Sequence, residues 1–109
     1  MRQINTSSQI VAIATAVPKF KFNNINYDFL EKEKIKNFIK ITGVESRRIT
    51  KGSLCTSDLA IKAGEKIIKN LNWSKDSIDF IIFISQTSDY LTPATSVILQ
   101  DKLNLKNNL

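Results

Sequence analysis

The sequence predicts an α/β protein in which helices flank a mostly parallel sheet. The first observation is the segment from Asp79 to Ser85, which contains five consecutive β-branched or aromatic residues. A run this short, without polar alternation, is typical of a strand that is covered on both faces. The second observation is that helical periodicity precedes and follows this run. Strands and helices that alternate along a chain predict parallel strands joined by right-handed crossovers.

The first strand is predicted over residues 10–17, an apolar run that ends at Pro18. Proline withholds a donor from the hydrogen-bond ladder, so it suits the end of a strand. The run also has features of a signal peptide. It is at the short limit for the hydrophobic region of such a peptide, and only Arg2 supplies positive charge, so a buried strand is the favoured interpretation. Residues 20–26 follow and are predicted to form a loop, because Asn23 and its neighbour favour a turn.

The first helix is predicted to begin at Tyr27, because apolar residues recur from there at steps of three to four as far as Ile41. Glutamate and lysine residues occupy the opposite face. Gly43 follows as the predicted left-handed C-cap. Residues 44–50 come next, lack helical periodicity, and are predicted to be extended or loop-like.

The second helix is predicted to begin near Thr56 or Ser57, either of which can cap it, and Asp58 suits the positive end of the helix dipole. Its buried stripe is predicted to consist of Leu59, Ala60, Ala63, Ile67, Ile68 and Leu71. The single cysteine, Cys55, lies just before this helix. Because no histidine or second cysteine accompanies it, we expect a small packed residue and not a nucleophile.

The last helix is predicted to open at Pro93, where a missing amide donor costs nothing. Val97, Ile98 and Leu103 are its predicted inward residues. No repeat, low-complexity linker or domain boundary interrupts residues 1–109, which are therefore predicted to form one segment. No closing strand follows the last helix, and this would leave a sheet edge unpaired. The sequence thus predicts an incomplete fold.

The cysteine and histidine counts exclude several classes of site. With 1 cysteine and 0 histidines, the chain can form neither an internal disulfide nor a Cys–His or Ser–His nucleophile pair. A zinc site would have to rely on carboxylates, and we expect neither a metal nor a cofactor. One free thiol without an export signal favours a reducing cytoplasm. No apolar run is long enough to cross a bilayer.

The net charge of +6 supports two interpretations. The chain could be a non-catalytic basic interaction module that binds an acidic protein or nucleic acid. Alternatively, the lysines reflect compositional bias and solvate helix faces. The second interpretation is favoured, because aromatic residues do not interleave with the lysines and arginines cluster little. The same argument disfavours nucleic acid as a partner.

Five short phrases carry information beyond periodicity. They are residues 10–18, Ile41-Thr42-Gly43-Val44 followed by Arg47-Arg48-Ile49, Thr56-Ser57-Asp58-Leu59-Ala60, Ile78-Asp79-Phe80-Ile81-Ile82, and Ser85-Gln86-Thr87 leading to Thr92-Pro93-Ala94-Thr95. In this order and at this spacing they resemble the N-terminal part of β-ketoacyl-acyl-carrier-protein synthase III and related thiolase-fold condensing enzymes. The likeness spans essentially all of this chain but only the opening portion of the family's length. It implies a truncated thiolase-like fold and an acyltransferase role in fatty-acid or related lipid or polyketide biosynthesis.

The resemblance also implies a mechanism. Such enzymes take an acyl group from a thioester onto a cysteine, and a histidine and an asparagine then help to decarboxylate malonyl-carrier protein and condense the two. A thiolate at a helix N-terminus, with dipoles around the thioester oxyanion, suits this chemistry. The resemblance puts all three catalytic residues beyond this sequence, and Cys55 does not match the nucleophile. We therefore expect no catalytic residue here and no activity from the chain alone.

The resemblance assigns three substrate-binding positions to this chain. Relatives that accept acetyl-coenzyme A sandwich its adenine between a Trp and an Arg, at the positions of Asn37 and Ile41. The absence of both groups weakens the case for an acyl-coenzyme A donor. An acyl-carrier protein is the alternative donor, and the basic surface of the chain would suit it. The residue before the loop proline is often a Phe that enters the partner's acyl tunnel in a homodimer. Thr92 here implies a roomier tunnel. For the isolated chain the favoured interpretation is plainer, with Asn37 solvated and Thr92 starting a turn.

Overall fold

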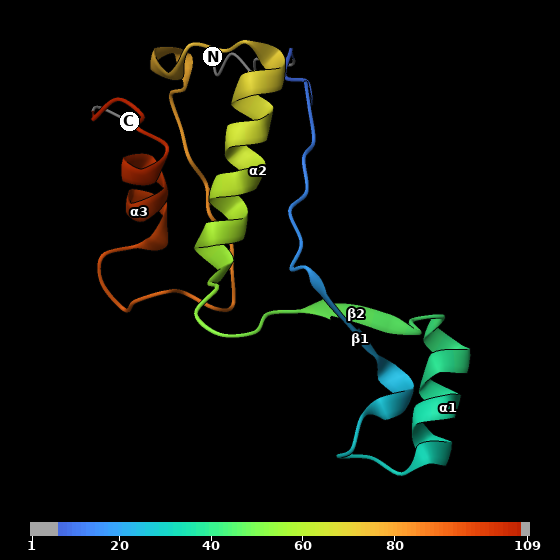
Figure 1. Cartoon of the computed structure of the whole chain (residues 1–109). Coiled ribbons are helices and arrows are strands. Elements are labelled where there is room, and N and C mark those ends of the chain that lie inside the picture. The colour runs from blue at the N-terminus through green and yellow to red at the C-terminus, as the bar shows by residue number, and fades with distance from the viewer. Residues whose placement is uncertain (1–6, 108–109) are drawn as a thin grey trace, which may run out of the picture.

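Two groups of helices joined by a narrow β-ribbon make up the chain in a computed structural model that describes residues 7–107 (Figure 1). The molecule measures 56 × 36 × 29 Å and has a radius of gyration of 18.8 Å. A compact domain of this length would have a radius of gyration of about 13 Å. The accessible surface is 9516 Å², whereas a compact protein of this mass exposes roughly 6,100 Å². Much of the surface that such a chain would normally bury is therefore open.

The ribbon pairs β1 (Phe20–Asn23) with β2 (Ser46–Ile49) in antiparallel orientation. It is the only sheet among residues 7–107, so the predicted parallel sheet is not confirmed. The extended segment predicted at 44–50 is confirmed. The loop predicted at 20–26 is wrong, because the asparagine turn signal marks only the end of β1, where the short 3-10 helix η1 (Asn24–Asn26) begins.

The smaller lobe is built around α1 (Lys32–Thr42), which begins five residues later than predicted. Gly43 ends it in the left-handed conformation, with φ of 70°, and its N–H donates to the Ile39 carbonyl at 2.8 Å, which confirms the predicted C-cap. Ile35, 3% exposed, is the buried anchor of this helix. Other apolar residues of α1 lie open, with Ile41 75% exposed.

The larger lobe contains α2 (Thr56–Leu71), the short η2 (Lys75–Ser77) and α3 (Thr95–Lys102). The helices α2 and α3 approach closely at Gly64, where an added Cβ would lie 3.3 Å from the Leu103 Cδ1 atom. The core of this lobe consists of Leu99, Leu103 and Leu105.

The structure corrects the predicted start of α3. Pro93 lies before the helix, and Ala94 is its N-cap. Of the three predicted inward residues only Leu103 is buried, because Leu99 takes the central position and Val97 is half exposed.

The start of α2 also differs from the prediction. Cys55, rather than Thr56 or Ser57, is its N-cap residue. The Cys55 N–H donates to the Asp58 carboxylate at 2.8 Å, so Asp58 does stabilise the N-terminus as expected. Cys55 is exposed and not packed. The six residues of the predicted stripe are half-buried, because the surface they face is only partly covered.

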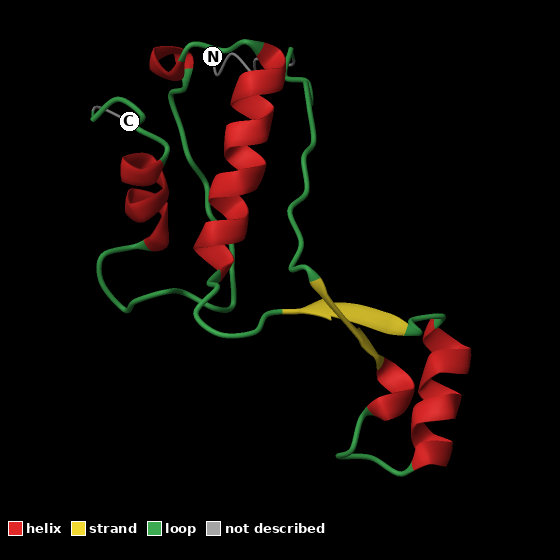
Figure 2. Cartoon of the chain, viewed as in Figure 1, coloured by secondary structure: helices red, strands yellow, loops and turns green. Residues whose placement is uncertain are grey.

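The segment predicted as the central strand, residues 79–85, is extended but pairs with no strand among the described residues (Figure 2). Phe80, Ile82 and Ile84 are 84%, 82% and 89% exposed, while Ile81 and Phe83 between them are half-buried. The prediction of burial on both faces is therefore wrong for this chain. One face of the segment packs on its own lobe, and no strand or helix lies over the other.

The predicted first strand, residues 10–17, behaves in the same way. It is drawn as loop in Figure 2 and pairs with no strand in the described part of the chain. Ile10 and Ile13 are 84% and 81% exposed, which contradicts the prediction of a buried strand. Within residues 7–107, no helix combines the length and the apolar character that a membrane span requires.

Candidate functional site

Two of the three predicted substrate-binding residues lie together on α1. Asn37 and Ile41 are one helical turn apart and so share a face of the helix. Both side chains are exposed, and Ile41 is open over three quarters of its surface. This face carries neither an aromatic ring nor a cation at those two positions.

Beneath α1 lies an apolar cavity of about 370 Å³. Asn37 and Ile41 are not among its lining residues, which are Asn24, Tyr27, Leu30, Ile35, Phe38, Val44 and Arg47. The predicted binding face therefore points away from the hollow of this lobe.

Asn24 fixes the geometry of the smaller lobe. Its side chain is almost fully buried; Nδ2 donates to the Val44 carbonyl at 2.8 Å, and Oδ1 accepts from Nη1 of Arg47. The Arg47 guanidinium in turn lies 4.8 Å from the centre of the Phe22 ring and 5.3 Å from that of Tyr27. The Asn24 side chain thereby links the end of β1 to Val44, which precedes β2, and to Arg47, which lies within β2. Sequence reasoning missed this residue, because it interpreted the asparagine pair as a turn signal.

Thr92, the third predicted residue, lies in the exposed loop before α3, and its peptide bond to Pro93 is cis. The beginning of this loop is held against the N-terminus of α2. The hydroxyls of Thr56 and Thr87 are 2.8 Å apart, and the hydroxyl of buried Ser57 donates to the Asp89 carboxylate. These four polar residues position the loop, and none of them was predicted to do so.

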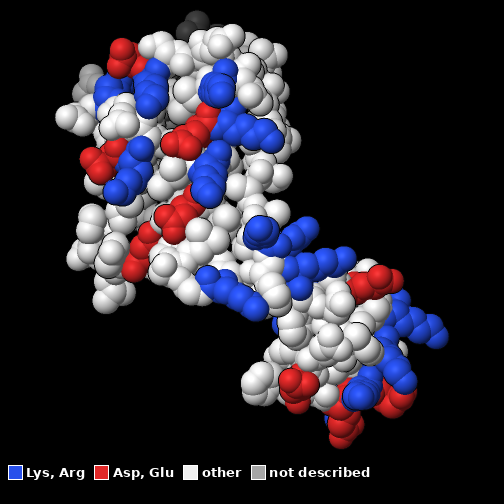
Figure 3. Space-filling model, viewed as in Figure 1, with Lys and Arg blue, Asp and Glu red and all other residues white. Residues whose placement is uncertain are grey.

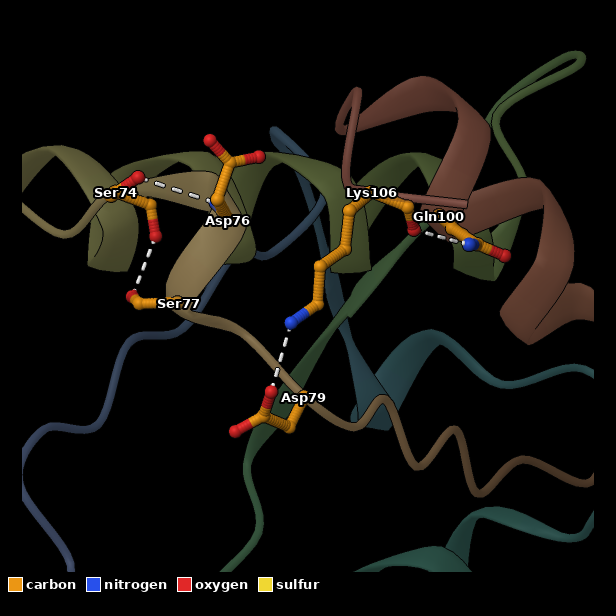
Figure 4. Close-up of polar contacts among 6 residues, drawn as sticks. All are labelled: Ser74, Asp76, Ser77, Asp79, Gln100 and Lys106. Atoms are coloured by element: carbon orange, nitrogen blue, oxygen red, sulfur yellow. Dashed lines mark hydrogen bonds and ion pairs between the residues drawn. The ribbon is translucent and has the colours of Figure 1, made fainter. Parts of the chain in front are cut away.

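The extended segment at 79–84 is anchored at its start to the turn that follows α3 (Figure 4). The ammonium of Lys106 lies 2.9 Å from Oδ1 of Asp79, and the Lys106 carbonyl accepts from the Gln100 amide at 2.7 Å. The side chain of Lys106 is 24% exposed, so this ion pair is partly shielded from solvent. The first residue of the segment is therefore fixed, while its apolar side chains remain open.

No single catalytic constellation emerges from these elements. The face of α1 that bears Asn37 and Ile41 and the loop that bears Thr92 belong to different lobes (Figure 1). Among residues 7–107, no group of acidic residues and cysteine could hold a metal ion. Cys55 is exposed, and the sequence contains no histidine that could serve it as a base.

Comparison with known proteins connects these elements to a family. No protein-family model matches the chain. It is 36% identical over 90 residues to the β-ketoacyl-[acyl-carrier-protein] synthase III of Fusobacterium nucleatum, covering 83% of this chain and 27% of that protein. It is 30% identical over 102 residues to synthase III 2 of Halalkalibacterium halodurans, covering 94% of this chain and 31% of the relative. The synthase III of Clostridioides difficile is 30% identical over 104 residues.

A solved structure agrees with the sequence matches. The crystal structure of a 3-oxoacyl-(acyl-carrier protein) synthase from Burkholderia xenovorans superposes with a TM-score of 0.75 and 36% identity, over 88% of this chain and 29% of that one. The chain is a β-ketoacyl-acyl-carrier-protein synthase III-like sequence. It spans about a third or less of the length of the relatives that it matches.

The resemblance inferred from the five sequence phrases is thus confirmed. The fold matches part of a 3-oxoacyl-(acyl-carrier protein) synthase, but the parallel sheet predicted with it is not confirmed among residues 7–107. The assignments of Asn37, Ile41 and Thr92 to substrate binding stay predictions. At the two predicted positions on α1 the structure has an exposed amide, Asn37, and an exposed aliphatic side chain, Ile41.

Proposed function

We propose that this chain is the N-terminal portion of a synthase III-like acyltransferase of fatty-acid or related lipid biosynthesis. In this role it supplies scaffold and substrate contacts, and the remaining two thirds of the fold supplies the reactive groups. The names of three relatives, which match 83%, 94% and 95% of this chain, support the proposal.

The observation that carries the proposal is the bare apolar face of residues 79–84. Its three outward side chains are each more than four-fifths exposed, which soluble proteins rarely allow for adjacent large apolar groups. The accessible surface exceeds that of a compact protein by roughly 3,400 Å². Obligate interfaces bury about 2,000–5,000 Å² counted over both partners, so an excess of this size on one partner is more than such an interface requires. In the completed protein, residues 10–17 and 79–84 are proposed to be parallel strands of one covered sheet.

The chain alone is proposed to be inactive. Acyl transfer to a thiol needs a nucleophile with a base or a lowered pKa nearby, and decarboxylation needs donors that stabilise the developing charge. Cys55 caps a helix at an exposed position, and its Sγ–H donates to the Ser53 carbonyl at 3.5 Å. The nucleophilic cysteine, the histidine and the asparagine therefore belong, in this proposal, to the remainder of the fold.

The acyl donor is proposed to be an acyl-carrier protein rather than acetyl-coenzyme A. Asn37 and Ile41 give α1 neither a face on which adenine can stack nor a cation to lie over it. The small side chain of Thr92 is proposed to leave a wide acyl tunnel in a homodimer. The lone thiol supports a site of action in the reducing cytoplasm.

The proposal is tested by joining the chain to the remaining portion of the Fusobacterium nucleatum relative and purifying this chimera beside the 109-residue chain. Decarboxylation of malonyl-carrier protein and condensation are then measured with acyl-carrier protein and acyl-coenzyme A donors. We expect activity from the chimera and none from the chain. The matched control is the chimera whose nucleophilic cysteine, in the relative's portion, is replaced by alanine, while Cys55→Ser should leave activity unchanged.

Two outcomes would contradict the proposal. Activity of the 109-residue chain alone would refute the claim that its reactive groups lie elsewhere. The proposed reaction would be refuted by a chimera that circular dichroism shows to be folded but that is inactive with every donor. The donor assignment has its own test, because Asn37→Trp combined with Ile41→Arg should raise the use of acetyl-coenzyme A by the chimera. An unchanged donor preference would show that these two positions do not select it.

A further inference from the structure

A hollow of about 280 Å³ lies between the carboxyl end of the extended segment 79–84 and the start of α3. Its walls come from Phe83 and Ser85, from the loop that follows them, and from the first turn of α3 (Figure 1). In open α/β folds, ligands bind where a strand ends and the next helix begins. The volume is just below the range of about 300–1,000 Å³ typical of pockets for drug-sized ligands, so the hollow suits a small ligand.

The first turn of α3 leaves backbone donors without acceptors. Ala94 is the N-cap residue, and its side chain cannot accept a hydrogen bond. The N–H of Val97 donates to the Ala94 carbonyl at 3.0 Å, whereas the N–H groups of Thr95 and Ser96 have no acceptor among residues 7–107. No acidic residue lies in this turn. The positive end of the helix dipole is therefore uncompensated beside the hollow.

Thr95 provides a second and independent observation. It is only 4% exposed, and its Oγ1 has no hydrogen-bond partner, a condition that no other buried side-chain nitrogen or oxygen shares within residues 7–107. Buried polar groups in native proteins nearly always have a partner, so an orphan group points to a bound water, ion or ligand. Thr95 lines the hollow, and threonine has two accessible rotamers in a helix. Its hydroxyl can therefore turn to an acceptor that occupies the hollow.

Three more hydroxyls line the hollow. They belong to Ser88 and Tyr90 in the loop and to Ser96 in the helix, and none has a partner in the described part of the chain. The hydroxyl of Ser85 differs, because it donates to the Thr87 carbonyl at 3.0 Å. The lining contains no Lys, Arg, Asp or Glu. The hollow thus combines free hydroxyl and N–H donors with no fixed charge.

We propose that this hollow binds phosphate, either as the free ion or as the phosphate group of a small phosphomonoester. Helix N-termini bind such anions through their free N–H groups and the helix dipole. A phosphate group offers three strong acceptor oxygens, whereas a carboxylate offers two, so phosphate can accept from more of the donors around the hollow. None of these donors has a part in the proposed acyl transfer, so the site is independent of that reaction.

The charges nearby leave the hollow open to an anion. Asp89 is the only charged residue of the loop 85–94; its carboxylate accepts from the Ser57 hydroxyl, and the residue does not line the hollow. In Figure 3 the blue side chains gather where the two lobes join, away from the start of α3. Hydroxyls and N–H groups, and not Lys or Arg, would therefore hold the phosphate. Its binding should survive physiological ionic strength, which screens the attraction of anions to exposed cations.

The test follows the amide signals of the ¹⁵N-labelled 109-residue chain by NMR during titration with sodium phosphate, methyl phosphate or sodium acetate at constant ionic strength. We expect the signals of Thr95 and Ser96 to shift and saturate with phosphate or its ester but not with acetate. The tighter of the two phosphate probes identifies the source of the group. The amides of Lys21 and Arg48, in the β-ribbon, report any unspecific attraction of anions and should not shift.

Two variants examine the donors. Thr95→Val keeps the shape of the side chain and should weaken phosphate binding about tenfold, because hydrogen bonds to charged groups are the strong ones. Without phosphate it should raise the midpoint of urea unfolding, since an unpaired buried hydroxyl is removed. Ala94→Asp places a carboxylate at the N-cap and should abolish binding. The matched control, Asn70→Asp, adds the same charge in the exposed last turn of α2 and should leave the affinity unchanged.

Four results would overturn the inference. They are the absence of saturable phosphate shifts at Thr95 and Ser96, acetate binding as tight as that of phosphate, an equal loss of affinity in Ala94→Asp and Asn70→Asp, and wild-type affinity in a folded Thr95→Val. The last result, together with a raised urea midpoint, would show that the orphan hydroxyl is only a packing defect. If Thr95→Val does not fold, Ala94→Asp and its control decide the question.

Discussion

Replacing Ile82 by alanine should have opposite consequences in the isolated chain and in the chimera. In the isolated chain the side chain of Ile82 is 82% exposed, so less than a fifth of it is shielded from water. Full burial of such a side chain contributes about 1.5–3 kcal/mol, so the loss on truncation should stay below about 0.5 kcal/mol. In the chimera the same side chain is proposed to lie inside a covered sheet, where truncation to alanine costs about 2–5 kcal/mol.

The matched control is Leu99→Ala, because Leu99 is 5% exposed in the isolated chain and packs in the core of the larger lobe. Its truncation should lower the free energy of unfolding by about 2–5 kcal/mol in both proteins. Urea unfolding followed by far-ultraviolet circular dichroism measures all four variants, since the helices supply the signal.

The comparison has two refuting results. If Ile82→Ala destabilises the isolated chain as much as Leu99→Ala does, the side chain is already buried and the open face does not exist. If Ile82→Ala costs as little in the chimera as in the isolated chain, the segment does not enter a sheet on completion. Either result would remove the structural argument for an incomplete thiolase-like fold.

Two further predictions concern the smaller lobe. Asn24→Ala removes the buried hydrogen-bond partner of the Arg47 side chain and should lower the free energy of unfolding by about 2 kcal/mol. The loss is measured as faster trypsin cleavage at the arginines of β2, with exposed Asn26→Ala as the control. Unchanged cleavage would contradict the stabilising role of the Asn24 side chain. Gly43→Ala places a Cβ at φ of 70° and should cost about 1 kcal/mol in urea unfolding. Gly43→Asn should cost less, because asparagine tolerates the left-handed region, and equal costs for the two would argue against the cap.

Local signals in the sequence were sufficient for part of the fold. Glycine at position 43 predicted the end of α1, because a left-handed residue satisfies carbonyls that the helix leaves unpaired. Helical periodicity predicted α2 within its observed bounds. The N-cap of α2 was misplaced by one or two residues, because threonine and serine caps are common, whereas here the Asp58 carboxylate satisfies the Cys55 N–H.

Non-local features could not be predicted in the same way. The composition of residues 79–84 is typical of a strand buried on both faces, yet the chain supplies neither a neighbouring strand in the described residues nor a layer to cover it. An apolar composition indicates that a segment is suited to burial, but the segment is buried only where other strands or helices cover it. For this reason the continuous apolar run predicted a buried central strand, whereas one face of the segment is exposed to solvent in the structure.

In the candidate site, too, local features could be predicted from the sequence and non-local ones could not. Exposure of Asn37 followed from the helical pattern, since it lies opposite Ile35 and away from the cavity. The role of Asn24 did not follow, because its side-chain partners Val44 and Arg47 are 20 and 23 residues away along the chain. A buried amide has no periodic signature, so only the fold reveals which donors and acceptors it joins.

Amide hydrogen exchange over residues 79–84 is the most direct test of the claim that this chain is an unfinished part of a larger sheet. In the 109-residue chain these amides should exchange rapidly, because no backbone hydrogen bond holds them. In the chimera they should gain protection comparable to that of α2. Strong protection in the isolated chain, or rapid exchange in a chimera that is catalytically active, would contradict the account.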